Sequence, residues 1–111
     1  MGDAVITLLA KTLQEHSRES DIISRWGGEE FVILLPQTTL EGAKIVAEKL
    51  RTQIEDLELA ISQEVFMKFT ISLGVSKVKH TEDDAESAIN CADKALYRAK
   101  ESGRNRVEVQ L

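Results

Sequence analysis

The chain has 111 residues, of which 42% are hydrophobic and 30% are charged. This length and composition fit one globular domain over residues 1–111 with a single core, and they argue against intrinsic disorder. The formal net charge of −5 argues against non-specific binding to nucleic acid or to an anionic membrane surface.

The one cysteine, Cys91, excludes an internal disulfide, which favours a cytoplasmic protein. It falls within an apolar helical pattern, where a small buried hydrophobic residue is expected. No apolar run approaches the roughly 20 residues of a membrane span, and no signal-peptide pattern opens the chain. We therefore expect a cytoplasmic chain without a membrane segment.

The first predicted element is a helix over residues 3–16, with apolar residues at a spacing of four and Asp3 as its N-cap. Strands follow over residues 21–26 and 31–35, and Pro36 ends the second of them. A Gly-Gly pair between two apolar runs predicts a tight hairpin, because glycine adopts positive φ angles readily. Trp26 is expected to pack beside this turn.

A capping box at Thr38 and Glu41 predicts a second helix that ends near Asp56. Residues 59–63 read as a connection, and residues 65–76 alternate between apolar and polar side chains as one long strand. The last helix is expected to open at Thr81 and to end at Gly103, and a short strand over residues 106–109 follows. This order predicts an α+β fold, an antiparallel-rich central sheet flanked by helices.

Two acidic residues, Glu29 and Glu30, directly follow the glycines Gly27 and Gly28. Carboxylate oxygens suit a hard divalent cation, and glycines let a phosphate chain approach the backbone. A plain hairpin does not need this pair of acids. The hairpin is therefore a candidate site for a metal ion and a phosphate ligand, and a solvated turn is the alternative.

The stretch Gly27–Phe31, read as GGEEF, resembles the signature of the GGDEF family, the diguanylate cyclases. Three further segments resemble family motifs in order and spacing: Gly2-Asp3, residues 70–75 and residues 92–105. The resemblance covers essentially the whole chain. It implies a palm-like fold of the nucleotidyl-cyclase type.

The family joins two GTP molecules into cyclic di-GMP, with two domains facing each other. The resemblance therefore implies GTP and cyclic di-GMP as ligands, a homodimer, and Mg²⁺ or Mn²⁺ as the cofactor. Glu29 and Glu30 match the acidic pair implicated in metal binding and in activating the attacking hydroxyl, and the division of these roles stays open.

The substrate contacts implied by the resemblance involve five residues: Gly27 and Gly28 beside the nucleotide, Asp3 at the guanine base, and Lys100 and Arg104 at the terminal phosphates. From the residues alone, Asp3 is also a good N-cap. Lys100 and Arg104 also suit the negative end of a helix dipole. Both interpretations stay open.

Arg18 and Asp21 match the Arg-x-x-Asp pattern with which the family binds inhibitory cyclic di-GMP. Lys49 stands where some members add a second arginine, and it keeps the charge without the bidentate geometry. The alternative is a solvated charged connection.

Family members carry a strand with a metal-binding aspartate before the Gly-Asp element, and this chain begins at Met1. We therefore expect a domain that lacks its first strand and is catalytically poor, with open strand edges that favour dimer pairing. The alternatives are a non-catalytic cyclic di-GMP-binding module and a structural or dimerisation remnant. A related palm-type nucleotidyl cyclase or polymerase fits the motifs less well.

Overall fold

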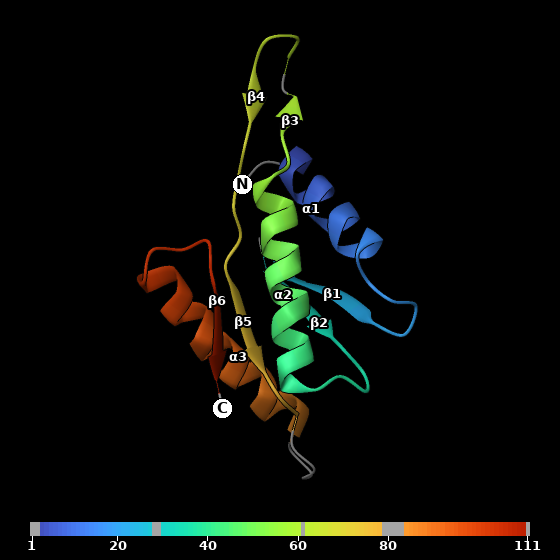
Figure 1. Ribbon diagram of the computed structural model, residues 1–111, viewed down its shortest axis with the longest axis vertical. Helices are drawn as coiled ribbons and strands as arrows, with labels where there is room; N and C mark the ends of the chain where they lie inside the picture. Colours follow the sequence, from blue (N-terminus) through green and yellow to red (C-terminus); the bar gives the residue numbers. More distant parts are fainter. Residues whose placement is uncertain (1–2, 28–29, 61, 79–83, 111) are drawn as a thin grey trace. The chain divides into compact units, whose positions relative to one another are not determined.

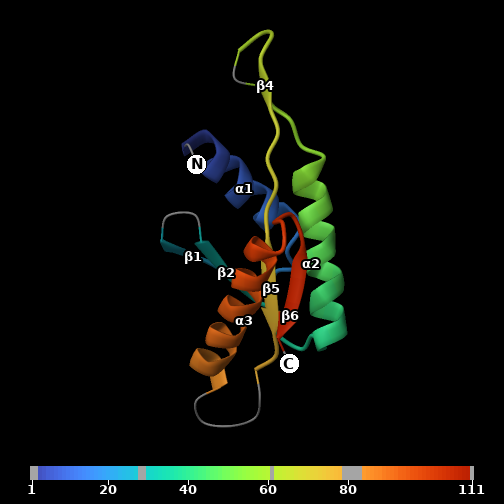
Figure 2. The same cartoon turned by 90° about the vertical axis from the view of Figure 1, so that its left-hand side faces the viewer.

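The computed structural model describes residues 3–27, 30–60, 62–78 and 84–110. The chain forms two compact units, residues 1–38 and residues 39–111. The helices and short strands alternate along the chain as an α+β fold, as predicted (Figures 1 and 2). No helix within the described residues is both long and apolar enough to cross a membrane. That residues 1–111 form one domain stays a prediction.

The first unit opens with helix α1 (Asp3–Glu15), close to the predicted range. One stripe of the helix is buried, and it consists of Val5, Ile6, Leu9 and Leu13. Thr12 is buried beside this stripe, and its hydroxyl donates a hydrogen bond of 2.8 Å to the carbonyl of Leu8. The side chain of Asp3 lies outside the described part, so its capping role stays a prediction.

Strands β1 (Ile22–Gly27) and β2 (Glu30–Leu34) form the predicted antiparallel hairpin. Gly27 pairs with Glu30, so Gly27 belongs to the strand, and its prediction as a turn residue was wrong. The register shifts between Arg25 and Gly27, which leaves Trp26 at a bulge. Trp26 is 57% exposed, so the expectation that it packs was wrong. A bulge changes the direction of a side chain relative to a regular ladder, which a sequence pattern does not reveal.

The second unit begins with helix α2 (Leu40–Glu55), which buries Ala47, Leu50 and Ile54. Its N-cap is Thr39, whose hydroxyl oxygen accepts a 3.0 Å hydrogen bond from the N–H of Gly42. The predicted cap at Thr38 was therefore wrong by one residue. Both threonines can cap a helix, and Thr39 has the extended backbone that is typical of an N-cap, with φ −72° and ψ 162°.

The long strand predicted over residues 65–76 was wrong, because two short strands lie there with different partners. Strand β4 (Phe66–Met67) pairs antiparallel with β3 (Leu59–Ala60), inside the segment that was expected to be a connection. Strand β5 (Leu73–Ser76) pairs in parallel with β6 (Val107–Gln110). Within the described residues, 68–72 have no strand partner.

The β5–β6 pair lies between α2 on one side and α3 (Asp84–Glu101) on the other, and the β3–β4 hairpin projects beyond the C-terminal end of α2 (Figures 1 and 2). Helix α3 buries small side chains, namely Ala88, Ala95 and Ala99. Small residues allow a close approach of the helix to the strands. The predicted opening of α3 at Thr81 lies outside the described residues.

Hydrogen bonds of two side chains, Ser76 and Arg98, connect α3 to these strands. The hydroxyl of Ser76 donates to the carbonyl of Ala88 at 2.5 Å. Arg98 donates to the carbonyl of Val109 at 2.9 Å and to the side chain of Gln110 at 2.5 Å. The strand and the helix approach each other closely at Gly74, where an added Cβ would lie 1.9 Å from the carbonyl oxygen of Ala92 and 2.5 Å from the nitrogen of Leu96.

We expect Gly74→Ala to lower the free energy of unfolding by about 3 kcal/mol, because the new methyl group would meet backbone atoms that cannot turn away. Urea denaturation followed by circular dichroism measures the change. Ser76→Ala is the matched control on the same strand, since it removes one hydrogen bond without a clash and should cost about 1 kcal/mol. Equal unfolding midpoints for Gly74→Ala and the unsubstituted chain would contradict the expectation.

Candidate functional site

The end of the β1–β2 hairpin carries the acidic residues that the sequence singled out. Glu30 is the first residue of β2 and is exposed, directly opposite Gly27 in the pairing register. Gly28 and Glu29 lie outside the described part. Within the described residues, no three His, Cys, Asp or Glu side chains gather into a metal site. A metal site at Glu29 and Glu30 therefore stays a prediction.

Arg18 and Asp21 form the best-defined polar cluster of the first unit. Nε and Nη2 of Arg18 both donate to Oδ1 of Asp21, at 3.2 and 3.0 Å, and the backbone N–H of Arg18 donates to Oδ2 at 2.9 Å. The backbone N–H of Asp21 donates in turn to the carbonyl of Arg18 at 3.1 Å. The carboxylate of Asp21 thus accepts hydrogen bonds from both the backbone N–H and the guanidinium of Arg18, which closes the turn.

Two residues that the sequence had not linked to Arg18 complete this cluster. Nη2 of Arg18 donates to the carbonyl of Pro36 at 3.0 Å and to the hydroxyl oxygen of Thr38 at 2.7 Å. The same hydroxyl donates to the Pro36 carbonyl at 3.0 Å. Gln37 between them has a φ of 52°, the turn conformation that presents both oxygens. No local sequence signal points to contacts 18 and 20 residues away.

Exposure and charge differ within the pair. The Asp21 side chain is 4% exposed and that of Arg18 is 55% exposed. The hydrogen bond from the Arg18 side chain lowers the pKa of Asp21, and it outweighs the opposing effect of burial. The guanidinium of Arg18 is therefore held in place and partly open to solvent, while the carboxylate that neutralises it is buried. Within the described residues, Nη1 of Arg18 has no hydrogen-bond partner.

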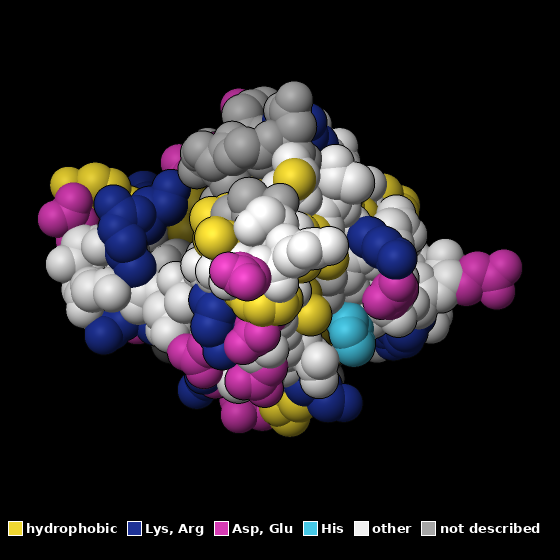
Figure 3. All heavy atoms as spheres, turned by 90° about the horizontal axis from the view of Figure 1, so that it is seen from above, with side chains coloured by type: hydrophobic (Ala, Val, Ile, Leu, Met, Phe, Trp, Pro, Cys, Tyr) yellow, Lys and Arg dark blue, Asp and Glu magenta, His cyan; other side chains and the backbone are white. Residues whose placement is uncertain are grey.

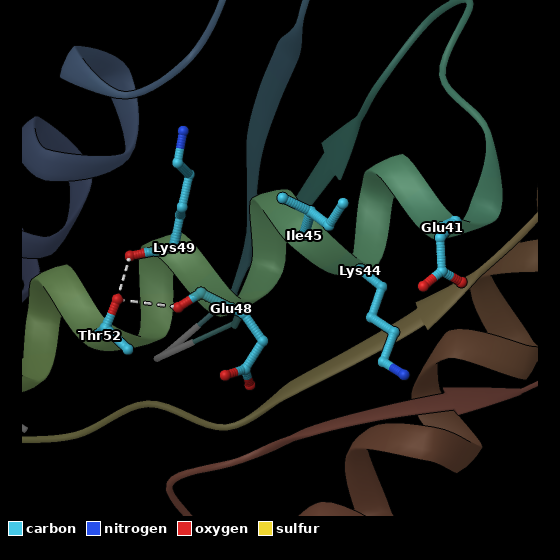
Figure 4. A pocket seen from close by; sticks show the side chains of 6 residues that line it. All are labelled: Glu41, Lys44, Ile45, Glu48, Lys49 and Thr52. Atoms are coloured by element: carbon cyan, nitrogen blue, oxygen red, sulfur yellow. Dashed lines mark hydrogen bonds between the residues drawn. The ribbon is translucent and has the colours of Figure 1, made fainter.

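Lys49 lies in the second unit, on the exposed side of α2. It borders a shallow depression of about 350 Å³ on this helix, which is lined by Glu41, Lys44, Ile45, Glu48, Lys49 and Thr52. Figure 4 shows the side chains of Lys44 and Lys49 extending in different directions, while Thr52 hydrogen-bonds the carbonyls of Glu48 and Lys49. The depression is open to solvent, and Lys49 is an exposed cation at its border.

Lys100 and Arg104 lie on either side of the turn that ends α3. Lys100 is in the last helical turn, and both side chains are exposed. Gly103 has a φ of +117°, and the N–H of Arg104 donates to the carbonyl of Ala99 at 2.9 Å, so the predicted glycine C-cap is confirmed. Neither cation has a side-chain partner among the described residues. Both are therefore available to an anionic ligand.

Charges of both signs share the surface. On the face that Figure 3 shows, the acidic and basic side chains of the described residues are interspersed. An anionic ligand on such a face depends on a few cations with defined geometry, because a broad positive field is not built there.

Comparisons with known proteins extend over nearly the whole chain. The family model described as diguanylate cyclase, GGDEF domain, matches residues 1–106. The diguanylate cyclase DgcM of Escherichia coli K12 is 42% identical over 106 residues, which are 96% of this chain and 25% of that protein. The chain thus spans about a quarter of the length of this relative.

Two solved structures share the fold. The active GGEEF domain of a diguanylate cyclase from Vibrio cholerae has a TM-score of 0.83 and 33% identity, covering 98% of this chain and 68% of that one. The GGDEF domain of DgcB from Caulobacter crescentus, solved in complex with c-di-GMP, has a TM-score of 0.86 and 29% identity, covering 95% of this chain and 62% of that one.

We expect Arg18→Met to raise the pKa of Asp21, because the variant removes the hydrogen bond that favours the carboxylate. In the unsubstituted chain the folded-state pKa is depressed. The stabilisation from the pair is therefore present above the unfolded-state pKa of about 3.9 and is lost as pH falls through the folded-state pKa. An NMR titration of the Asp21 carboxyl carbon measures the shift. Glu19→Gln is the control, and an unchanged Asp21 titration in Arg18→Met would contradict the assignment.

Proposed function

The chain belongs to the GGDEF domain family of diguanylate cyclases, and from that membership we propose that it condenses two molecules of GTP into cyclic di-GMP. The observation that carries the proposal is the β1–β2 hairpin, which presents the exposed Glu30 of the GGEEF stretch opposite Gly27. Each domain binds one GTP, so the reaction requires a homodimer in which two nucleotides face each other.

The acidic pair supplies the metal chemistry in this proposal. Glu29 and Glu30 hold Mg²⁺ or Mn²⁺, since carboxylate oxygens are the donors these hard cations prefer and Glu30 is open to solvent. When bound, the metal neutralises charge on the triphosphate and assists activation of the 3′-hydroxyl. Glu29 and Glu30 share these roles, and the sequence does not assign one role to each.

Five residues bind the substrate in this proposal. Gly27 and Gly28 leave room for the nucleotide beside the backbone, and Asp3 accepts hydrogen bonds from the guanine base. Lys100 and Arg104 contact the terminal phosphates, supported by their exposure and by the lack of side-chain partners among the described residues.

Product inhibition is proposed at Arg18 and Asp21, with Lys49 as a further cation. Support comes from the fixed guanidinium, whose Nη1 group has no hydrogen-bond partner in the described part of the chain. A planar guanidinium suits both a phosphate and the Hoogsteen edge of guanine. The DgcB domain with a similar fold was solved with c-di-GMP. The same cluster also favours the second candidate function, a non-catalytic cyclic di-GMP-binding module.

We expect isothermal titration with a non-hydrolysable GTP analogue and MgCl₂ to show binding that Glu30→Gln weakens at least about tenfold, because the variant loses a charged metal ligand. Chelating the Mg²⁺ should weaken the binding of the analogue to the unsubstituted chain and leave its binding to the variant almost unchanged. Glu19→Gln is the control, an exposed glutamate outside the proposed site. Equal affinities for the unsubstituted chain and Glu30→Gln would count against the acidic pair as the metal site.

We expect cyclic di-GMP to bind the chain and Arg18→Ala to weaken this binding by about tenfold or more, because charge-assisted hydrogen bonds from the guanidinium are lost. Lys11→Ala, which removes an exposed cation of the same unit that pairs with Glu15 at 3.9 Å, should have no effect. Chromatographic assay of GTP turnover then separates the two functions. Turnover identifies a cyclase, binding without turnover identifies a binding module, and no binding of either nucleotide identifies a structural remnant.

A further inference from the structure

The turn after α3 places three successive residues in the left-handed region of backbone conformation. The φ angles are +117° at Gly103, 63° at Arg104 and 47° at Asn105. Glycine adopts this region freely and asparagine tolerates it, whereas arginine does not favour it. The conformation of Arg104 must therefore be held by its surroundings.

Backbone contacts fix the turn on both sides of Arg104. Its own N–H donates to the carbonyl of Ala99 at 2.9 Å. The N–H of Asn105 donates to the hydroxyl oxygen of Ser72 at 3.1 Å, and the carbonyl of Arg106 accepts from the N–H of Leu73 at 3.0 Å. The turn is thereby attached to the end of α3 and to the start of β5.

The side chain of Asn105 attaches the same turn to α2. Its Oδ1 accepts a 3.0 Å hydrogen bond from Nη1 of Arg51, and its Nδ2 donates to Oε2 of Glu55 at 2.5 Å. Both ends of the amide are therefore used, and they are used by two residues of one helix. Arg51 and Glu55 lie 54 and 50 residues away from Asn105 in the sequence.

Arg51 is itself held by acidic neighbours. Nε and Nη2 donate to the two carboxylate oxygens of Glu48 at 3.1 and 3.2 Å, and Nη1 lies 3.6 Å from Oε2 of Glu55. The Arg51 side chain is 18% exposed. With two carboxylates against it, Arg51 is poorly suited to bind phosphate directly, and its contact with Asn105 is its link to the turn.

We infer that Asn105, oriented by Arg51 and Glu55, is a positioning residue that holds Arg104 in the conformation in which it contacts the terminal phosphates of the nucleotide. This inference rests on the proposed function, because it takes Arg104 as a phosphate contact. Asn105 itself is not proposed to contact the nucleotide. The effect of Asn105 on binding is transmitted through the backbone of its neighbour.

The test is isothermal titration of the chain with a non-hydrolysable GTP analogue and with GMP, both with MgCl₂. Asn105→Ala should lower the affinity for the triphosphate about tenfold, which is the effect of one lost charged contact. It should leave the affinity for GMP within about twofold. Asn105→Gly is the second variant, because it accepts the positive φ without strain and still removes the amide contacts. It should give the same loss as Asn105→Ala.

The combination with Arg104→Ala distinguishes positioning from an independent effect. The double variant Arg104→Ala/Asn105→Ala should bind the triphosphate no more weakly than Arg104→Ala alone, because Asn105 acts only through Arg104. Arg98→Ala is the matched structural control: it removes hydrogen bonds between α3 and β6 and should leave both affinities unchanged.

Three outcomes would overturn the inference. Losses that add in the double variant would show that Asn105 acts on its own. Asn105 variants that bind like the unsubstituted chain while Arg104→Ala binds weakly would refute positioning and leave the proposed function intact. Normal triphosphate binding by Arg104→Ala would refute the phosphate role of Arg104, and the inference with it.

Discussion

The close contact between Gly74 and the backbone of α3 is the constraint on which the arrangement of residues 39–111 depends. Strand β5 passes the helix so closely that a Cβ would lie 1.9 Å from the carbonyl oxygen of Ala92. Strand β6 follows β5 in parallel register from Leu73 opposite Val107. The turn between α3 and β6 is therefore fixed from both ends. A glycine without chemical function thus determines where Lys100 and Arg104 lie.

The sequence predicted the elements whose signals are local. Helical periodicity and a C-terminal glycine gave three helices close to their observed ranges, and the glycine-rich stretch gave the hairpin. The strand over residues 65–76 was mispredicted because alternation reports the two faces of an extended segment. It does not report which partners are available. Here the partners are β3 for one half and β6 for the other, and both lie elsewhere in the chain.

The candidate sites divide in the same way. The sequence singled out Arg18 and Asp21 by their spacing of three residues, and the structure adds that the two side chains pair with each other. The contacts of Arg18 with Pro36 and Thr38 depend on the backbone at Gln37 and had no local signal. Asn105 was noticed only as part of a motif, and its link to Arg51 spans 54 residues.

In this chain, whose net charge is −5, acidic side chains orient two arginines, Arg18 and Arg51. Ion pairs at a protein surface contribute only about 0–1 kcal/mol to stability. Because the side chain of Arg18 is 55% exposed, we take the main consequence of its pairing with Asp21 to be geometric. Fixing the guanidinium in advance removes part of the roughly 0.5–1.5 kcal/mol that immobilising a long side chain costs on binding. Glu48 and Glu55 act similarly on Arg51, but there the group that is held in place is the backbone turn at Asn105. The proposed product site thus presents a rigid cation. At the proposed phosphate contact, Arg104, the backbone of an exposed residue is held instead, by hydrogen bonds to Ala99 and through Asn105 to Ser72.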